Sequence, residues 1–451
     1  MRVALFAENF SDSAFDSAPE RYASGLAKAL AAAGHETHVV AFISAEPGST
    51  VASGWPNLPL AKRLRGIEVE GEGDKVRLDL FEGTTSAGVA LSLLHATDGA
   101  DLDTPLRVRA LAACVSRFAD APELVLAFEP VGAYAAQLLA EGKREGESRQ
   151  GLLLVNAATL DMLKGRKAAP LRKALGLAKA TLPDQLKRFD LCLALTHFPL
   201  GALEKDERPE WIVSMPDAID AAVFNPSTSA ALAFRFDAFD QRGRELAQGE
   251  IRRRLELDIA PDATPLVLLP TVLGDAPTLK LEDVELVAEM CLADSAQLVI
   301  EWDGQQEELG RLIERLKEAH PGRVAGAAAS PGAAHLALVA AADIVVLSGE
   351  SEARRLEGLL ALRFGAIPVL ARAGGIDARL LDLDECGLSG YAVLADSAAP
   401  EALREALKRA LYMLHRVEQP STLRQRLMLL EVGFEPLARL VEVLFAETNR
   451  D

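Results

Sequence analysis

The stretch that divides this chain reads Asp217-Ala218-Ile219-Asp220-Ala221-Ala222-Val223-Phe224-Asn225-Pro226. It lies between two series of short apolar runs, and helical patterns separate the runs within each series. The Val, Leu and Ile residues of these runs do not alternate with polar residues, which is typical of parallel strands buried on both faces. Strands that alternate with helices predict an α/β fold, with one doubly wound half on each side of the stretch.

The apolar runs set the expected domain organisation. They are Val3–Ala7, Thr37–Ile43, Leu124–Phe128, Leu152–Val155, Leu191–Leu195 and Ile212–Met215 in the first series, and Leu266–Leu269, Leu298–Trp302, Val324–Ala328, Ile344–Leu347 and Ile367–Leu370 in the second. We expect a first domain over 1–215, a hinge and insertion over 216–262, a second domain over 263–420 and a C-terminal helical segment over 421–451. Ligands of open α/β sheets bind beyond the carboxyl ends of the strands, so we expect a cleft between the two domains.

Composition narrows the class of protein. The 451 residues are 49% hydrophobic and 25% charged, with a net charge of -18, which argues against a nucleic-acid partner. The first apolar stretch is too short for a signal peptide and is soon followed by an acidic residue. The longest apolar run, His335–Leu347, is interrupted by Asp343. We therefore expect a cytoplasmic protein without a membrane segment.

The cysteines indicate neither a metal site nor a disulfide framework. Cys114, Cys192, Cys291 and Cys386 form no Cys-x-x-Cys pair and have no histidine at metal-ligand spacing. Cys192 lies inside an apolar run and is expected to be a small buried side chain. We expect no metal and no cofactor.

The dividing stretch resembles the hinge motif of bacterial glycogen and starch synthases, in which Asn-Gly-Ile-Asp is followed by an aromatic residue, Asn and Pro. A more specific resemblance is the run Ala361-Leu362-Arg363-Phe364-Gly365-Ala366-Ile367-Pro368-Val369, followed by Gly374-Gly375-Ile376-Asp377. That family has Arg-Tyr-Gly-Thr-Ile-Pro-Val and then Thr-Gly-Gly-Leu in this order. The resemblance covers roughly residues 1 to 415. It implies the GT-B fold, in which two Rossmann-like domains face a central cleft and a C-terminal helix packs back on the first domain.

The loop after the first strand departs from the family. Transfer from a sugar nucleotide needs cations and backbone N–H groups aimed at the leaving diphosphate. The family's Lys-x-Gly-Gly loop falls on Phe15-Asp16-Ser17-Ala18, so the lysine and both glycines are replaced. The alternative frame Pro19-Glu20-Arg21 resembles a related family with Gly-Gly-x-Glu-Arg, but its glycines also fall on Ser17 and Ala18. We take Phe15, Asp16 and Ser17 as residues of the expected cleft.

Two further segments of the first half are compared with the family. Its Ile-His-Asn reads Leu154-Val155-Asn156, and its His-Asp-Trp region reads Phe128-Glu129-Pro130. His197 ends a strand near the expected cleft, where a lone histidine is more often structural than catalytic. We assign Asn156, His197 and Asp217 to the cleft, and none of them a catalytic role.

The second half keeps only part of the family's donor site. The segment Pro270–Lys280 has no arginine, and Lys280 reaches the lysine position only if the loop carries an insertion. The family's Glu-Pro-Cys-Gly aligns with Glu352-Ala353-Arg354-Arg355, so the glutamate is kept and the phosphate-binding glycine becomes Arg355. Either Arg354 and Arg355 bind phosphate in a rearranged site, or they begin a solvated helix. Gly374 and Gly375 form either a backbone approach to a ligand or a simple tight turn.

A basic segment interrupts the acidic chain between Lys164 and Arg188. Its cations are Lys164, Arg166, Lys167, Arg172, Lys173, Lys179, Lys187 and Arg188. One interpretation is a solvated helical face, and the other is a surface for an anionic protein partner.

Two hypotheses about function follow. In the first, the chain is a degenerate, non-catalytic GT-B protein that binds a protein partner or a carbohydrate. In the second, it is a retaining glucosyltransferase that extends an α-glucan from ADP-glucose or UDP-glucose. In both, the cleft is the expected place for a glucan or a sugar nucleotide.

Overall fold

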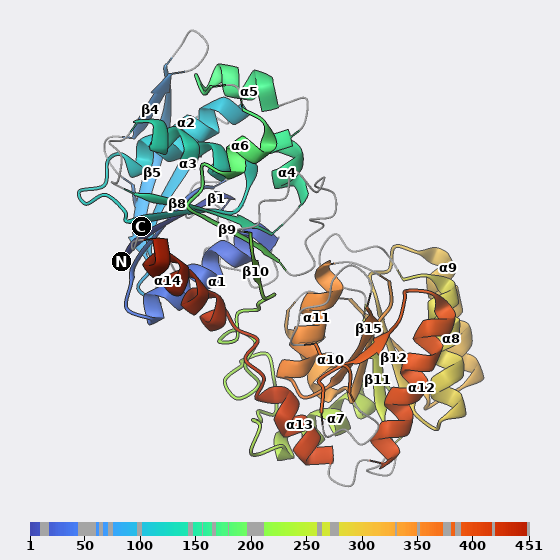
Figure 1. The fold of residues 1–451 in the computed structure, drawn as a ribbon. Helices are drawn as coiled ribbons and strands as arrows, with labels where there is room; N and C mark the ends of the chain where they lie inside the picture. Colours follow the sequence, from blue (N-terminus) through green and yellow to red (C-terminus); the bar gives the residue numbers. More distant parts are fainter. Residues whose placement is uncertain are drawn as a thin grey trace. The chain divides into compact units, whose positions relative to one another are not determined.

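The computed structural model describes residues 1–9, 18–43, 60–62, 66–70, 75–96, 102–142, 148–155, 157–164, 168–178, 180–195, 212–258, 264–270, 279–329, 332–349, 352–372, 380–383, 389–416 and 420–448. The chain divides into two compact units (Figure 1). Unit 1 consists of Met1–Pro216 and Phe434–Asp451, and unit 2 is Asp217–Gly433. None of the helices in the described ranges has the length and apolar character needed to cross a membrane.

The described part of unit 1 is built on a 10-stranded sheet. Its strands follow the order β10-β9-β8-β7-β1-β2-β6-β5-β3, and the remaining strand, β4, pairs with β5. The bounds are β1 (Arg2–Asn9), β2 (Glu36–Phe42), β3 (Ala61–Lys62), β4 (Ile67–Glu70), β5 (Lys75–Thr84), β6 (Ala90–Ala96), β7 (Leu124–Ala127), β8 (Arg149–Leu154), β9 (Leu191–Leu195) and β10 (Val213–Met215). From β10 to β6 neighbouring strands are parallel, whereas β5 runs antiparallel to β6, β4 and β3.

Helices cover this sheet and include the C-terminal one. They are α1 (Ala18–Ala32), α2 (Thr104–Val115), α3 (Pro130–Gly142), α4 (Ala157–Lys164), α5 (Ala168–Ala174), α6 (Leu182–Leu186) and α14 (Glu435–Thr448). Helix α14 packs on α1, where the Phe434 ring meets Tyr22 edge to face at 5.2 Å. A Cβ on Gly25 would lie 2.1 Å from that ring, so only glycine fits there. The predicted packing of a C-terminal helix on the first domain is confirmed.

Unit 2 contains, in its described residues, a 6-stranded parallel sheet with the order β13-β12-β11-β14-β15-β16 (Figure 1). The strands are β11 (Leu266–Leu269), β12 (Gln297–Trp302), β13 (Val324–Ala328), β14 (Ile344–Leu347), β15 (Ile367–Ala371) and β16 (Val393–Ala395). The helices are α7 (Arg242–Arg254), α8 (Leu281–Ala293), α9 (Glu307–Ala319), α10 (Ala333–Ala341), α11 (Glu352–Arg363), α12 (Pro400–Arg416) and α13 (Pro420–Met428). The predicted α/β class with doubly wound parallel sheets is confirmed.

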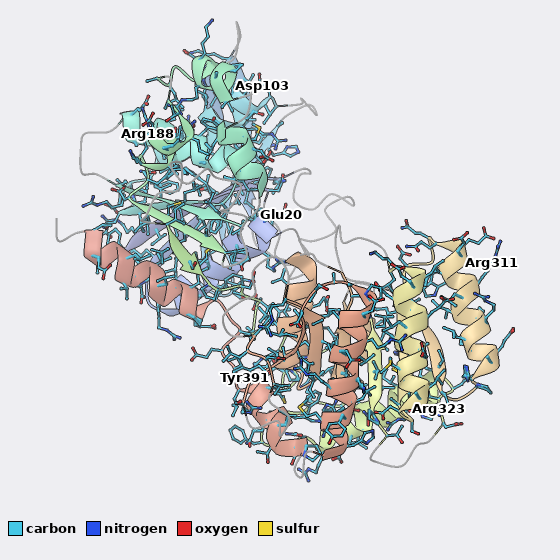
Figure 2. All side chains as sticks on the ribbon, turned by 45° about the vertical axis from the view of Figure 1, so that its right-hand side comes forward. Glu20, Asp103, Arg188, Arg311, Arg323 and Tyr391 are labelled. Carbon is cyan, nitrogen blue, oxygen red and sulfur yellow. The ribbon has the colours of Figure 1, made fainter. Side chains whose placement is uncertain are left out.

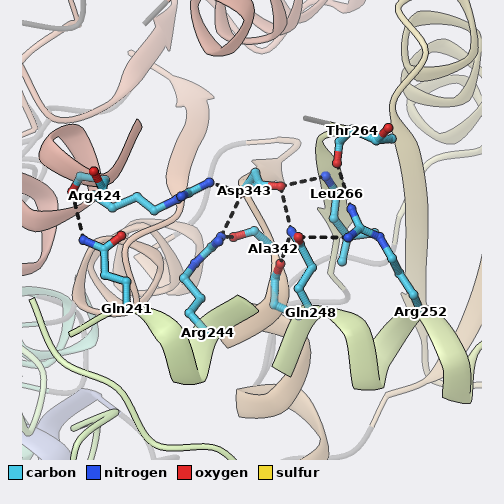
Figure 3. Close-up of polar contacts among 11 residues, drawn as sticks. Gln241, Arg244, Gln248, Arg252, Thr264, Leu266, Ala342, Asp343 and Arg424 are labelled. Carbon is cyan, nitrogen blue, oxygen red and sulfur yellow. Dashed lines mark hydrogen bonds and ion pairs between the residues drawn. The ribbon is translucent and has the colours of Figure 1, made fainter. Parts of the chain in front are cut away.

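A buried carboxylate joins α7 and α13 to the amino edge of this sheet (Figure 3). Asp343 precedes β14 and accepts hydrogen bonds from Arg244 at 3.0 Å, Gln248 at 2.8 Å and Arg424 at 2.9 Å. It also accepts the backbone N–H of Leu266 at the start of β11, at 2.9 Å. One side chain therefore ties two helices and two strands together.

The dividing stretch is held inside unit 2. The Arg363 guanidinium donates to the carbonyl oxygens of Phe224 at 3.2 Å and Met428 at 3.5 Å. The backbone N–H of Ile219 donates to Val432 O at 3.0 Å. The segment that enters unit 2 and the segment that leaves it are thus bonded to each other and to the end of α11.

Candidate functional site

Strand order identifies where each unit is expected to bind a ligand. In unit 1 the chain winds from β1 toward β2 on one side and toward β7 on the other, and in unit 2 β11 lies between β12 and β14 in the same way. Ligands of open α/β sheets bind at such switch points, beyond the carboxyl ends of the strands. These two carboxyl edges are the candidate sites, and each is described within its own unit.

Carboxylates gather at the switch point of unit 1. Glu8 is the penultimate residue of β1, and its backbone N–H donates to Glu129 Oε2 at 2.5 Å. Glu129 itself follows β7 and precedes α3. Arg107 lies 3.2 Å from Glu8 Oε1 and places its guanidinium over the Phe42 ring. Glu20 lies in the first turn of α1, where Figure 2 labels it.

Burial changes the protonation of Glu129. It raises the pKa of this carboxyl to about 7, and the negative charges of Glu8 and Glu20 add to the effect. Near neutral pH Glu129 therefore both donates and accepts hydrogen bonds, as a hydroxyl ligand requires. A phosphate at this edge would meet the carboxylate of Glu8, which already engages Arg107.

Sequence reasoning noted Glu129 but did not assign it to the site. Its signal is a carboxylate that directly follows a buried strand, at the place where the resembling family has His-Asp-Trp. The predicted cleft residues Phe15, Asp16, Ser17, Asn156 and His197 lie outside the described residues. Asp217, the remaining predicted cleft residue, belongs to unit 2 and is fully buried.

A buried triad occupies the carboxyl edge of unit 2. His335, in the first turn of α10, has Nδ1 2.8 Å from Glu301 Oε2 and Nε2 3.1 Å from Glu357 Oε2. Burial opposes a charge on this imidazole, yet the carboxylates of Glu357 and Glu301 outweigh it and raise its pKa to about 10. His335 is thus an imidazolium that donates from both ring nitrogens.

Sequence reasoning missed this triad. Glu301 interrupts the apolar run of β12, and His335 begins the long apolar run of α10. A polar residue inside an apolar run is a signal for a buried partner, because burying a lone charge is costly.

The structure describes only some of the predicted donor-site residues of unit 2. Lys280 is exposed, precedes α8 and lies 3.8 Å from Glu282 Oε1. The backbone of Glu352, Arg354 and Arg355 forms the first turn of α11, while their side chains lie outside what the structure describes. Gly374 and Gly375 also fall outside the described residues.

Within the basic segment, the expectation of an exposed Arg172 is wrong. Arg172 is 2% exposed, and its Nη1 donates to Gln137 Oε1 at 2.7 Å and Gln185 Oε1 at 3.1 Å. Burial lowers the pKa of its guanidinium. Of the other predicted cations, Lys173 and Lys187 are exposed and Arg188 pairs with Glu141 at 2.6 Å, whereas Arg166, Lys167, Lys179 and the side chain of Lys164 lie outside the description.

Side chains that could ligate a metal ion do not cluster in the described part of the chain. Among those residues, no group of three or more His, Cys, Asp or Glu side chains could hold a metal ion. Cys114, Cys192 and Cys291 are buried free thiols, and burial raises the pKa of Cys114 and Cys192 to about 12.

Comparison with known proteins identifies relatives. No family model matches the chain. The glycogen synthase of Bordetella bronchiseptica is 28% identical over 240 residues, which are 51% of this chain and 46% of the relative. That of Methylocella silvestris is 28% identical over 248 residues, or 54% and 50% of the two chains. The chain therefore spans about half the length of the curated relatives it matches.

Solved structures match over the whole length. The catalytic domain of starch synthase IV from Arabidopsis thaliana, bound to ADP and acarbose, aligns with a TM-score of 0.79 at 17% identity and covers 100% of this chain and 99% of that one. Sucrose-phosphate synthase from Thermosynechococcus elongatus aligns at 0.59 with 14% identity, over 99% and 98% of the two chains. WaaG, a glycosyltransferase of lipopolysaccharide biosynthesis, aligns at 0.52 with 14% identity, over 98% and 99%. The chain is thus similar in sequence to bacterial glycogen synthases over about half of its length, and it has the GT-B fold of glycosyltransferases.

Proposed function

We propose that this protein binds a neutral carbohydrate, such as an α-glucan, at the carboxyl edge of unit 1 and does not transfer sugar from a nucleotide. The observation that carries the proposal is the charge at that edge. Glu8, Glu20 and Glu129 lie together with Arg107, whose cation is already engaged by Glu8.

Electrostatics argue against a diphosphate. The leaving diphosphate of a sugar nucleotide gains negative charge, and enzymes stabilise it with cations and backbone N–H groups. The loop after β1 carries Phe15 and Asp16 where the resembling family has a lysine and a glycine-rich turn. The carboxylate of Glu8, near the end of β1, makes the same region less favourable for phosphate.

The same groups suit a sugar. Carboxylates accept hydrogen bonds from hydroxyl groups, and a carboxyl with a pKa about 7 also donates one near neutral pH. The relatives are named glycogen synthases, and the starch synthase IV domain was solved with ADP and acarbose. The proposed ligand is therefore a carbohydrate, as acarbose is for the starch synthase IV domain, but no nucleotide is bound with it.

An active retaining glucosyltransferase that extends an α-glucan from ADP-glucose or UDP-glucose is the second candidate. The names of the relatives favour it, as does the full-length match to a starch synthase catalytic domain. Its donor site would draw its cations from Lys280, Arg354 and Arg355 and its backbone donors from Gly374 and Gly375.

A protein partner is the other ligand class for a binding role. Lys173 and Lys187 are exposed cations in a chain of net charge -18, so they would favour an acidic surface. Such binding weakens as salt rises. Arg172 takes no part, because it is buried.

A transfer assay separates the two candidates. The purified protein is incubated with ADP-glucose or UDP-glucose and a glucan primer, and nucleotide release, glucan growth and glucan retention are measured. We expect glucan retention without nucleotide release. We also expect Glu129→Gln to weaken retention, while the exposed Glu68→Gln on β4 does not. Nucleotide release with glucan growth would make the second candidate correct.

A further inference from the structure

A cavity lies at the amino edge of the sheet of unit 1, at the end of the strands opposite the candidate site. Its volume is about 730 Å³, which is within the range of small-molecule sites. Its described lining comes from the starts of β1, β2 and β6, the end of β5, β3 and the segment after α2. Arg2 lies six residues before Glu8 on β1, so the cavity is roughly 20 Å from the carboxyl edge. The cavity is therefore separate from the carbohydrate site proposed above.

Small side chains beside His38 leave room for this cavity. Ala4 of β1 and Ala90 of β6 are the register neighbours of His38 on either side, and Thr84 of β5 is the neighbour of Ala90. Residues paired in this way project from the same face of a sheet. All four residues line the cavity. Its floor is thus one imidazole between two methyl groups, with a hydroxyl group beyond them.

The imidazole of His38 is held in place and uncharged. Its Nε2 lies 2.8 Å from Ser92 Oγ, and its ring stacks on that of Phe118 with the centroids 4.2 Å apart. Burial lowers the pKa of His38 to about 4, although the charge of Glu82 opposes the shift. A neutral imidazole has one N–H group and one acceptor nitrogen. The ring is therefore suited to a ligand that can both donate and accept hydrogen bonds.

Two guanidiniums at the cavity are held by backbone carbonyls. Arg2 Nε donates to Ala121 O at 3.0 Å, and Arg117 Nη1 donates to Gly66 O at 2.9 Å. A guanidinium carries five N–H groups, so each of these arginines keeps donors for a ligand. Their positions are set before a ligand arrives, which lowers the entropy cost of binding.

Carboxylates line the same cavity as these guanidiniums. Glu36 begins β2 as the register neighbour of Arg2, and Glu82 and Asp120 also line the cavity. An anion would meet carboxylates there and a cation would meet guanidiniums. A hydroxyl group, in contrast, donates to the carboxylates and accepts from the guanidiniums. The lining therefore favours a neutral ligand with several hydroxyl groups.

We propose that this cavity is a second binding site, which takes a neutral mono- or disaccharide. The sugar hydroxyl groups bond to the carboxylates, the guanidiniums and His38, and the C–H face of the sugar ring packs on the small apolar side chains of Ala4 and Ala90. The proposal goes beyond the proposed function, because it places a short sugar at the edge opposite Glu129 and does not require binding at the carboxyl edge.

The test fills the cavity from its floor. Ala90 begins β6 and is half-buried, so Ala90→Phe places a ring beside His38 and introduces a residue that strands favour. Maltose is titrated into the full chain, and the ring signals of His38 are followed by NMR. We expect saturable shifts in the wild type and at least tenfold weaker binding in Ala90→Phe. The matched control is Ala328→Phe, at an exposed strand position of unit 2, which should bind maltose as the wild type does.

The outcomes separate the second site from the proposed function. Glu129→Gln should leave the response of His38 intact, and a wild type that retains no glucan would count against the proposed function alone. A wild type without a saturable response of His38 to maltose would overturn the second site, and so would an Ala90→Phe protein that binds maltose normally. Tighter binding of glucuronate or glucosamine than of glucose would overturn the neutral ligand class. If Ala90→Phe does not fold, Thr84→Tyr fills the cavity from the exposed end of β5.

Discussion

Glu129 is a carboxyl whose protonation depends on folding. Its pKa is about 7 in the folded protein and has an ordinary value of 4.5. Between these pH values the folded state holds a proton that the unfolded state has lost, so stability is fully present below pH 4.5 and falls as the pH rises through 7. We expect the buried Glu129 carboxyl to lower the free energy of unfolding by about 2–3 kcal/mol at pH 8.

Glu129→Gln should remove that dependence. The variant should gain stability relative to the wild type at pH 8 and gain little at pH 4.5, as measured by urea unfolding at both pH values. Glu68→Gln is the control, because Glu68 is exposed on β4. A wild-type to variant difference that does not change with pH would mean that Glu129 titrates normally.

Arg172 and Lys173 are neighbours with opposite environments. Arg172→Ala should destabilise the protein by about 3 kcal/mol, since the buried amide oxygens of Gln137 and Gln185 lose their donor. Lys173→Ala should change stability by less than about 0.5 kcal/mol, because Lys173 is exposed. Thermal unfolding of both variants checks this pair. Equal effects would contradict the buried position of Arg172.

The buried carboxylate of Asp343 holds two helices, α7 and α13, against the sheet of unit 2. Removing its carboxylate leaves Arg244 buried without its counter-charge and releases α7 and α13 from the sheet edge (Figure 3). Asp343→Ala should lower the free energy of unfolding by about 3–5 kcal/mol. Hydrogen exchange should also speed up along α7. Asp240→Ala, which breaks the exposed pair with Arg242, should leave the unfolding transition unchanged. Unaltered hydrogen exchange in α7 would contradict the role of Asp343 in holding this helix against the sheet.

Buried parallel strands were predictable because both of their faces require apolar residues. Leu266–Leu269 and Ile344–Leu347 are strands with the predicted bounds. The hairpin of β5 and β6 was not predicted, since Lys75–Thr84 mixes charged residues with apolar ones as a partly exposed strand does. The C-terminal segment also forms two helices, of which α13 belongs to unit 2 and α14 to unit 1.

The candidate site was less predictable, because it depends on tertiary contacts. His335 is paired with Glu301 and Glu357, which lie 34 and 22 residues away, and no local pattern indicates those partners. Arg172 lies in a run of cations that resembles a solvated face, yet Gln137 is 35 residues away. The departures from the family motif at Phe15 and Asp16 were visible in the sequence, and so was Glu129 after its strand.

At the scale of the whole molecule, two doubly wound units are joined by two chain crossings. The first crossing follows Pro216 and the second precedes Phe434, and Ile219 is bonded to Val432 between them within unit 2. Each unit carries carboxyl groups at the carboxyl edge of its sheet, Glu8 and Glu129 in one and Glu301 and Glu357 around His335 in the other. The proposed function requires that this GT-B fold does not bind a sugar nucleotide tightly.

Calorimetric titration with ADP, ADP-glucose and UDP-glucose tests that claim most directly. Arg107 is engaged by Glu8 at the edge of unit 1, and the family's lysine and glycines are replaced in the loop after β1, so we expect no binding in the micromolar range for any of the three nucleotides. A maltooligosaccharide titrated under the same conditions confirms that the protein is competent to bind. Micromolar affinity for ADP-glucose or UDP-glucose would contradict the proposed function and establish a working donor site.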